Sequence, residues 1–305
     1  MDILYWFESI RNPVLDAIMQ TITYLGDELL FIVLALMVFW CVDKKEGYYL
    51  LFVGFFGTLL NQFLKLLCRV PRPWEKDPNF TIVEAARAGA DGYSFPSGHT
   101  QSVTGTLGGI ARWHKGKTLR IVCIVFLLLT AISRMYLGVH TLQDVGVSLL
   151  IGAVLVFGFY PIVKNAADSP KKMYLLIGSM LLLSLGFVLY ANLSDFPDAV
   201  SDNVYSGRKN SYSLFGALLG FAIAYPIEHK RIRFCSKASL PAQVCKLLVG
   251  LVLLLGIMEG LKPVFALFGL TWLGMNAVRY CAVVLFAALA WPLSFPFWTR
   301  LFSKE

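Results

Sequence analysis

The stretch GYYLLFVGFFGTLLNQFLKLL, residues 47–67, contains a single charge, Lys65, close to its C-terminal end. An α-helix rises about 1.5 Å per residue, so about 20 mostly apolar residues cross the hydrocarbon core of a bilayer. The stretch therefore predicts a transmembrane helix with a cation near one end. Similar stretches recur along the chain, and the nine candidate spans lie at about residues 25–42, 47–67, 98–113, 118–136, 140–163, 172–192, 210–228, 246–268 and 275–297.

The composition agrees with this interpretation. Of the 305 residues, 57% are hydrophobic and only 15% are charged, whereas a soluble domain has about 25% charged residues. The mean hydropathy is +0.65. We therefore expect an all-α, polytopic membrane helix bundle with about nine transmembrane helices.

The net charge of +8 comes from lysines and arginines that cluster in short loops between apolar runs. Such clusters indicate membrane topology and contacts with phosphate or lipid headgroups, and they argue against nucleic-acid binding. Four basic loops, at residues 44–45, 112–117, 164–172 and 229–233, are predicted to lie inside, which puts the N-terminus outside. Segment 65–93 is basic yet falls outside, so its charges are expected to have another role.

The N-terminal segment, residues 1–23, differs from the predicted spans. Charged residues such as Asp2, Glu8 and Arg11 are interspersed with apolar ones, and Pro13 interrupts the segment. This pattern predicts an amphipathic helix, broken near Pro13, that lies in the membrane interface. The segment has no basic start followed by a small-residue cleavage site, so no cleavable signal peptide is expected.

Three parts of the chain are expected: the interfacial helix 1–23, a helical core of residues 24–168, and an additional four-helix transmembrane bundle of residues 169–305. In the last part, AIAYPIEHKRIRF at 222–234 resembles ALAWPLSFPFWTRLF at 288–302, which suggests a repeated hairpin. An equally good explanation is that aromatic–proline pairs are common where helices leave a membrane. Glu259 and Lys262 fall inside a predicted span, where they either neutralise each other or serve a function.

Three short polar motifs interrupt the apolar sequence, and all fall at the ends of predicted spans on the same side of the membrane. In chain order they are Lys65 with Arg72-Pro73, then Pro96-Ser97-Gly98-His99, then Ser133-Arg134 with His140 and Asp144. A compact bundle would bring these span ends together. The motifs are therefore the candidate functional residues.

Two histidines and a carboxylate have the spacing of a nucleophilic site. His140 and Asp144 are four residues apart, which places them on one face of a helix. A carboxylate there can hold one ring nitrogen as N–H and leave the other free as a nucleophile. His99, beside the bound group, is placed to donate a proton to a leaving oxygen. Taken alone, His140 and Asp144 could equally be a structural helix pair.

The remaining motif residues suit the binding of an anion. Lys65, Arg72 and Arg134 supply three positive charges, and guanidinium groups match phosphate oxygens in a bidentate manner. Ser97 and Gly98 come at the start of the third span, where backbone N–H groups lack helical partners and can point at an anion. Taken alone, Lys65 and Arg72 could be ordinary cations at the membrane interface.

Together, the three motifs resemble the three-part signature of the type 2 phosphatidic acid phosphatase superfamily, in its membrane lipid-phosphatase branch. Every motif position is matched in order, and the resemblance covers roughly residues 20–165. It implies that His140 attacks phosphorus and forms a phosphohistidine, that Asp144 orients His140, and that His99 protonates the leaving group. It also implies a phosphate-binding set made of Lys65, Arg72, Ser97, Gly98 and Arg134.

The expected function is that of an integral-membrane phosphatase in the cell membrane, with its active site on the extracytoplasmic face. The substrate would be a polyprenyl diphosphate such as undecaprenyl diphosphate, or a glycerolipid phosphate such as phosphatidate or phosphatidylglycerophosphate. The resemblance implies no metal and no other cofactor. The expected partners are the lipid substrate and membrane lipids, with no nucleic acid, and homo-oligomerisation stays open. Two alternatives are a lipid phosphotransferase, which passes the phosphoryl group to an alcohol, and a lipid-binding or transport protein.

Overall fold

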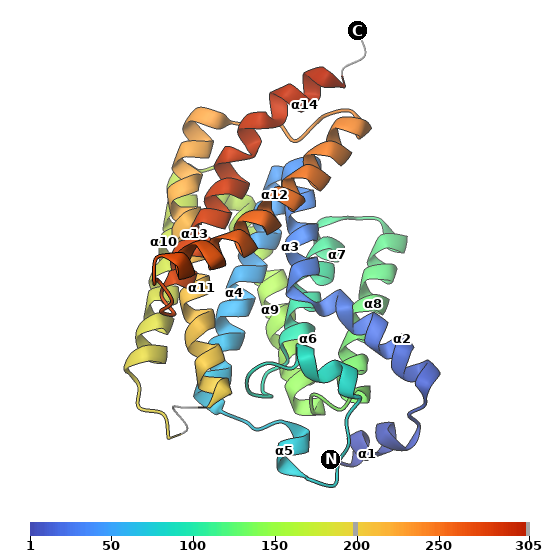
Figure 1. Cartoon of the computed structure of the whole chain (residues 1–305). Helices are drawn as coiled ribbons and strands as arrows, with labels where there is room; N and C mark the ends of the chain where they lie inside the picture. The colour runs from blue at the N-terminus through green and yellow to red at the C-terminus, as the bar shows by residue number, and fades with distance from the viewer. Residues whose placement is uncertain (198–200, 303–305) are drawn as a thin grey trace. The chain divides into compact units, whose positions relative to one another are not determined.

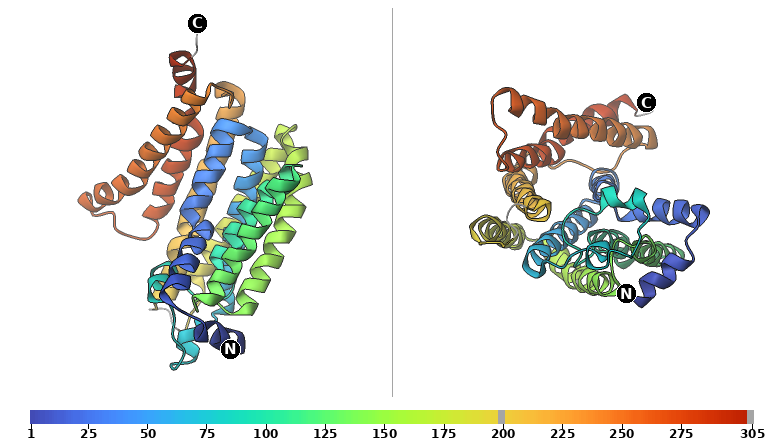
Figure 2. Two further views of the ribbon diagram at one scale, coloured as in Figure 1. Left: turned by 90° about the vertical axis from the view of Figure 1, so that its right-hand side faces the viewer. Right: turned by 60° about the horizontal axis from the view of Figure 1, so that its bottom comes forward.

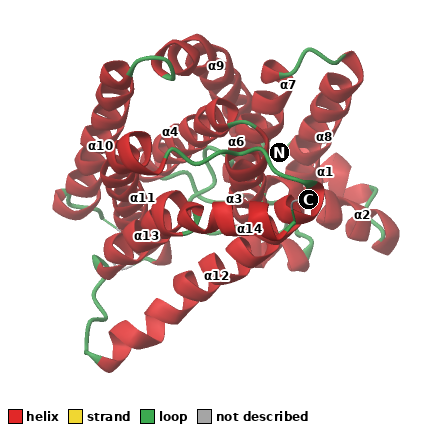
Figure 3. Ribbon diagram, turned by 90° about the horizontal axis from the view of Figure 1, so that it is seen from above, coloured by secondary structure: helices red, strands yellow, loops and turns green. Residues whose placement is uncertain are grey.

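The structure, a computed structural model, describes residues 1–197 and 201–302, and all regular structure in this part of the chain is helical (Figure 3). The helices are α1 (Asp2–Ser9), α2 (Pro13–Thr23), α3 (Glu28–Met37), α4 (Lys44–Cys68), α5 (Pro73–Lys76), α6 (Gly98–Val103), α7 (Gly109–Trp113), α8 (Lys117–Tyr136), α9 (Leu142–Ala166), α10 (Pro170–Leu193), α11 (Asp202–Ile227), α12 (Leu240–Leu267), α13 (Met275–Leu285) and α14 (Phe295–Leu301) (Figure 1).

Short 3₁₀ and π-helical turns extend or join several of these helices. The 3₁₀ turns are η1 (Tyr24–Gly26), η3 (Glu84–Gly89) and η7 (Pro292–Ser294). The π turns are η2 (Val38–Val42), η4 (Thr104–Gly108), η5 (Glu228–Ile232) and η6 (Phe286–Ala290). The π turn η4 joins α6 to α7, so residues 98–113 form one continuous helical segment.

The chain folds into two compact units. The first consists of Met1–Ile32, Tyr49–Ile162 and Asp195–Gly207, and it contains all three polar motifs. The second consists of Val33–Tyr48, Val163–Ser194 and Arg208–Glu305. It therefore contains most of the C-terminal half of the chain.

The prediction of a polytopic helical membrane protein is confirmed, but the number of nine spans is not. Within the described residues, six helices are long and apolar enough to cross a membrane. A seventh span is possible if α2 with η1 and α3 with η2, which meet at a bend of 51°, cross together. Segment 98–113 is short and polar, with Gln101 and several threonines, and the predicted span 210–228 in α11 begins with the polar residues Asn210, Ser211 and Ser213. Short length and polar residues explain why these two predicted spans are not among the helices that can cross a membrane.

The N-terminal segment is divided at the proline, as the sequence predicts. Pro13 is the first residue of α2, where a missing N–H has no consequence, and the Asn12 side chain caps the helix by accepting from Leu15 N at 3.1 Å. The segment is also tied to α8. Arg11 Nε donates to Tyr136 O at 3.0 Å, and Tyr136 Oη donates to Asp16 Oδ1 at 2.7 Å. Its location in the membrane interface stays a prediction.

Segment 98–113 lies inside the first unit because its small residues allow other helices to approach. A Cβ atom added at Gly109 would lie only 2.7 Å from the Leu50 side chain of α4. Thr104 and Thr106 satisfy their hydroxyls on backbone carbonyls one turn earlier, at 2.6 and 2.8 Å. Internal hydrogen bonding of this kind lets hydroxyl side chains sit within an apolar bundle.

The second unit is held together by aromatic side chains. Trp40 Nε1 donates to Ala287 O at 2.9 Å, and the rings of Trp40, Trp291 and Phe295 pack on one another. Helices α12 and α13 run antiparallel as a hairpin (Figure 2). On α12, Glu259 and Lys262 form an ion pair of 2.5 Å, as expected if they neutralise each other.

Candidate active site

The three polar motifs meet at one end of the first unit, which is the lower end in Figure 1. Lys65 lies in the last turn of α4, Ser97 caps α6, and the third motif extends from the end of α8 to the first turn of α9. The prediction that these span ends come together therefore agrees with the structure. The motifs are joined by direct side-chain and backbone contacts.

Arg72 links the first motif to the third and to the loop that precedes the second. Its guanidinium donates to the backbone carbonyls of Gly92, Asp91 and Val139 at 2.9–3.0 Å, and its Nη1 atom lies 3.1 Å from His140 Nε2. The side chain is 2% exposed. A buried guanidinium bonded in this way has a fixed position.

The contact with Arg72 defines the tautomer of His140. A guanidinium nitrogen can only donate, so Nε2 of His140 must be the acceptor and carry the lone pair. The proton is then on Nδ1, which faces Asp144 Oδ2 at 3.6 Å. This distance is too long for a hydrogen bond, but such contacts often shorten when substrate binds. The unprotonated Nε2 therefore faces the cationic part of the site.

Burial and charge keep His140 neutral. Burial lowers the pKa of the His140 imidazole well below its ordinary value, and the positive charge of Arg72 lowers that pKa further. The imidazole is consequently uncharged near neutral pH. Its Nε2 lone pair, which accepts from Arg72 Nη1, can react once Arg72 donates to a bound phosphate instead.

Asp144 is held in place by two donors. Ser94 Oγ donates to Asp144 Oδ2 at 2.6 Å, and Thr141 N donates to the same oxygen at 2.7 Å. Asp144 is 1% exposed. A buried carboxylate with two donors is fixed as an acceptor, and it remains directed at His140.

Two further cations, Lys65 and Arg134, use only part of their hydrogen-bonding capacity. Lys65 Nζ donates to Asp91 O at 3.0 Å, and Arg134 Nη1 donates to Thr23 Oγ1 at 2.7 Å. Nε and Nη2 of Arg134 are buried and have no hydrogen-bond partner among the described residues. Buried donors of a charged group are costly to leave unpaired, so an anionic ligand is the partner that they favour.

The second motif forms the start of α6. Ser97 is the N-cap, and its Oγ accepts from Thr100 N at 3.4 Å. The first backbone N–H groups of a helix have no intrahelical acceptor, so those of Gly98 and His99 can serve a ligand. His99 is half-buried and lies in the electrostatic field of Arg134 and His140. A Cβ atom at Gly26 would lie 2.6 Å from His99 O, so only glycine lets η1 pack here.

The arrangement brings three buried cations, Lys65, Arg72 and Arg134, to a region with one buried carboxylate, Asp144. It can bind an anion and present the lone pair of His140 to it. Among residues 1–197 and 201–302, no group of three His, Cys, Asp or Glu side chains is close enough to hold a metal ion.

Sequence reasoning missed several residues that support the site. Ser94 and Thr141 fix Asp144, and Thr23 binds Arg134. The positions of Ser94 and Thr141 within or beside the motifs were a usable signal. No sequence pattern pointed to Thr23 as a site residue, because it belongs to the segment expected to lie in the membrane interface.

Comparison with known proteins agrees with the motif resemblance. Residues 46–168 match the PAP2 superfamily, and residues 212–300 match the transmembrane extension of PAP2 superfamily phosphatases. Undecaprenyl-diphosphatase BcrC of Bacillus subtilis (strain 168) is 34% identical over 155 residues, which are 50% of this chain and 77% of that protein. Phosphatidylglycerophosphatase B of the same organism is 32% identical over 164 residues, 48% of this chain and 75% of that protein.

A more distant relative covers more of the chain. Sphingosine-1-phosphate phosphatase 2 of Homo sapiens is 25% identical over 242 residues, which are 77% of this chain but only 56% of that protein. No solved structure shows a significant match. The fold, the apolar helices and these relatives define a multi-pass membrane phosphatase that acts on lipid phosphates. The chain belongs to the PAP2 superfamily, as its motifs predict.

Proposed function

We propose that the protein hydrolyses a lipid phosphate or diphosphate through a phosphohistidine on His140. The lone pair of His140 Nε2 attacks phosphorus, and the bond from phosphorus to the leaving oxygen breaks. Burial and the neighbouring cations lower the pKa of the His99 imidazole well below its ordinary value, so His99 carries a proton only after the bound phosphate has offset those charges. It then gives that proton to the leaving oxygen. A water oxygen then attacks the same phosphorus while His99 accepts a proton from that water. The bond from phosphorus to Nε2 breaks, its electron pair returns to His140, and inorganic phosphate leaves.

The observation that carries the proposal is the pairing of a reactive nitrogen with unfilled cationic donors. His140 Nε2 is the unprotonated nitrogen of a buried imidazole, and Arg134 has two buried donors without partners. A phosphate could accept from Arg134 and from Arg72 while its phosphorus lies beside Nε2. Donors that are already in place stabilise the charge of the transition state at little reorganisation cost.

The proposed substrates are a polyprenyl diphosphate or a glycerolipid phosphate. One B. subtilis relative is named for undecaprenyl diphosphate and the other for phosphatidylglycerophosphate, which supports both classes. Detergent-purified protein should be given undecaprenyl diphosphate, phosphatidylglycerophosphate, phosphatidate and sphingosine 1-phosphate at equal mole fractions in micelles. A hydrolase releases inorganic phosphate from at least one of them. A phosphotransferase would instead produce a new phosphorylated alcohol, and a binding or transport protein would produce neither.

We infer that the three parts of the chain have separate roles, with the chemistry in residues 24–168 and none in the four-helix bundle 169–305. The PAP2 match at residues 46–168 and the separate extension match at residues 212–300 support this division.

The site should work without a metal ion, because Lys65, Arg72 and Arg134 supply positive charge to the phosphate. We expect phosphate release to be unchanged in excess EDTA. Vanadate, which adopts the trigonal-bipyramidal geometry of the transition state, should inhibit competitively with the lipid substrate. Steady-state rates with and without chelator check both statements. Loss of activity on chelation that added Mg²⁺ restores would contradict the site described here.

We propose a location in the cell membrane with the active site on the extracytoplasmic face. This follows from the basic loops, which are predicted to lie in the cytoplasm. In a variant without the six native cysteines that still releases phosphate, Ala85→Cys and Tyr205→Cys should react with an impermeant maleimide on intact cells. Lys115→Cys and Lys230→Cys should react only after permeabilisation. The reverse pattern would place the site on the cytoplasmic face.

A further inference from the structure

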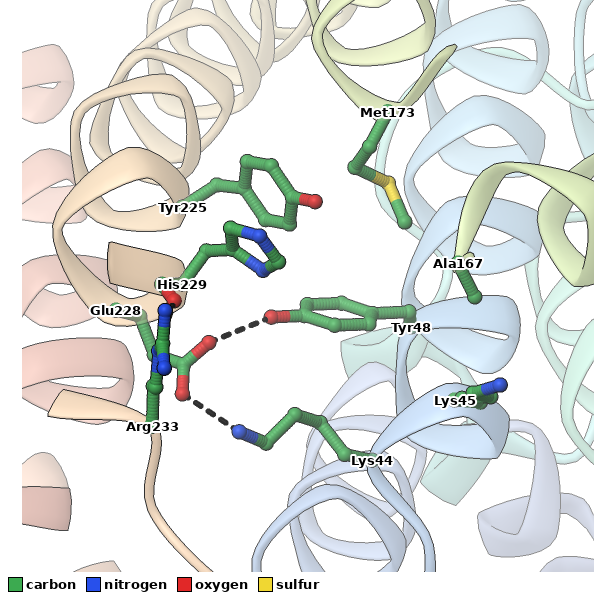
Figure 4. A pocket seen from close by; sticks show the side chains of 9 residues that line it. All are labelled: Lys44, Lys45, Tyr48, Ala167, Met173, Tyr225, Glu228, His229 and Arg233. Carbon is green, nitrogen blue, oxygen red and sulfur yellow. Dashed lines mark hydrogen bonds and ion pairs between the residues drawn. The ribbon is translucent and has the colours of Figure 1, made fainter. Parts of the chain in front are cut away.

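The second unit contains a cavity of about 310 Å³ that none of the motif residues line. This volume is at the lower end of the range for ligand-binding pockets, roughly 300–1,000 Å³. Figure 4 shows Tyr225 and His229 on one side of the cavity, Met173 and Ala167 on the other, and Tyr48 between them. The remaining lining residues are Lys44, Lys45, Glu228 and Arg233.

Lys44, which lines the cavity, and Lys65 lie at opposite ends of helix α4. Lys44 is the first residue of α4, and Lys65 lies in its last turn. With a rise of about 1.5 Å per residue, the intervening 21 residues extend about 31 Å, close to the thickness of a bilayer core. Lys44 therefore belongs to the membrane face opposite the one that carries Lys65.

The floor of the cavity is an ion pair whose groups already have partners. Glu228 is 3% exposed, and its carboxylate accepts from Lys44 Nζ at 2.6 Å and from Tyr48 Oη at 3.2 Å. Lys44 Nζ also lies 3.8 Å from the centre of the Phe234 ring. This network fixes the turn η5 against α4 and leaves Lys44 and Glu228 with no net charge between them.

The charge that remains at the cavity is positive. Lys45 pairs with Asp168 at 2.5 Å, but both side chains are more than half exposed, and such surface pairs contribute little. Arg233 is exposed and donates through Nε to His229 O at 3.1 Å, a hydrogen bond that does not use its terminal nitrogens. Lys45 and Arg233 can therefore exchange these weak contacts for a ligand anion.

The walls of the cavity are aromatic and apolar. The His229 ring stacks on Tyr225 at 5.6 Å and 18°, and Tyr174 packs edge-on against Tyr225 at 5.4 Å. Met173 is fully buried beside them. A soluble anion such as inorganic phosphate would gain nothing from these walls, whereas the glycerol and first acyl carbons of a lipid would.

We propose that this cavity binds the phosphate group of an anionic phospholipid, with Lys45 and Arg233 on the phosphate and Tyr225 and Met173 against the glycerol end. Basic pockets at the ends of transmembrane helices recognise acidic headgroups in this way. The site is independent of the proposed chemistry at His140, because binding there needs none of the three motifs.

The test is native mass spectrometry of the full chain, released from detergent in the presence of dihexanoylphosphatidylglycerol. The wild-type protein should retain one more lipid than Lys45→Gln/Arg233→Gln, whose apparent affinity for that lipid should fall by about tenfold or more. Ala167→Trp, which fills the cavity without changing charge, should have the same effect. Dihexanoylphosphatidylcholine, which has no net charge, should be retained equally by all variants.

The matched control is Lys230→Gln/Arg231→Gln. It likewise removes one lysine and one arginine charge, but from exposed residues of η5 that do not line the cavity. This control should keep the additional phosphatidylglycerol. Equal loss in both double variants, or retention by Ala167→Trp, would overturn the site. Inorganic phosphate or glycerol 1-phosphate that displaces the lipid at equal concentration would overturn the lipid assignment. The experiment measures lipid binding and not phosphate release. Its result therefore tests the cavity even if the proposed phosphatase activity is wrong.

Discussion

His140→Ala should release phosphate from its lipid substrate at least about 10⁴-fold more slowly than the wild-type protein. The substitution removes the Nε2 atom that accepts from Arg72 and that the proposed mechanism uses to attack phosphorus. No other nitrogen of the site is held in that position. The residual rate would be that of the bound lipid with water, assisted only by the cations.

The measurement is single-turnover phosphate release by purified protein whose melting temperature matches the wild type. His114→Ala is the matched control, since it removes an imidazole from a loop that belongs to none of the three motifs. It should retain activity within about threefold, because the side chain that it removes is not part of the site. A folded His140→Ala protein that keeps more than a few per cent of wild-type activity would rule out His140 as the nucleophile.

Asp144→Asn should lower kcat by about 10³-fold with a small effect on KM. The amide has the shape of the carboxylate, so it can fill the same space, but it lacks the charge that stabilises a protonated Nδ1. An amide N–H turned toward Nδ1 would also oppose the tautomer of His140 that Arg72 sets. The loss is smaller than that of His140→Ala because the nucleophile itself remains.

Ser94 provides the graded comparison for Asp144. Ser94→Ala removes the 2.6 Å hydrogen bond to Asp144 Oδ2 but leaves the one from Thr141 N. The expected loss in kcat is about tenfold, and Ser94→Thr, which keeps the hydroxyl, should recover most of it. A kcat for Asp144→Asn no lower than that for Ser94→Ala would show that Asp144 has only a structural role.

The sequence predicted the membrane class and the residues that meet at the site, because both depend on local patterns. Long apolar runs indicate spanning helices whatever their neighbours are. The motifs lie at the ends of such runs. Because basic and less basic loops alternate along the chain, the sequence predicts that all three motifs lie on one side of the membrane. The structure accordingly brings Lys65, Ser97 and His140 to one end of the first unit.

The sequence could not give the contacts that depend on how the helices pack. Thr23 and Arg134 are 111 residues apart, and no spacing rule connects them. Arg72 donates to the backbone carbonyls of Asp91 and Gly92. These contacts depend on the conformation of the loop and not on which side chains it carries, so no sequence motif reveals them. The number of spans was uncertain for a related reason, since the polar segment 98–113 is stable only when other helices surround it.

The central claim is that His140 becomes covalently phosphorylated during turnover. The most direct test is an alkaline quench, within the first turnover, of protein mixed with a lipid substrate labelled with ³²P at its terminal phosphate, followed by peptide mapping. We predict an alkali-stable, acid-labile label on the peptide that contains His140, with at most one phosphoryl group per chain, and none in His140→Ala. A label on His99, or no label while the wild-type protein continues to release phosphate, would contradict the account.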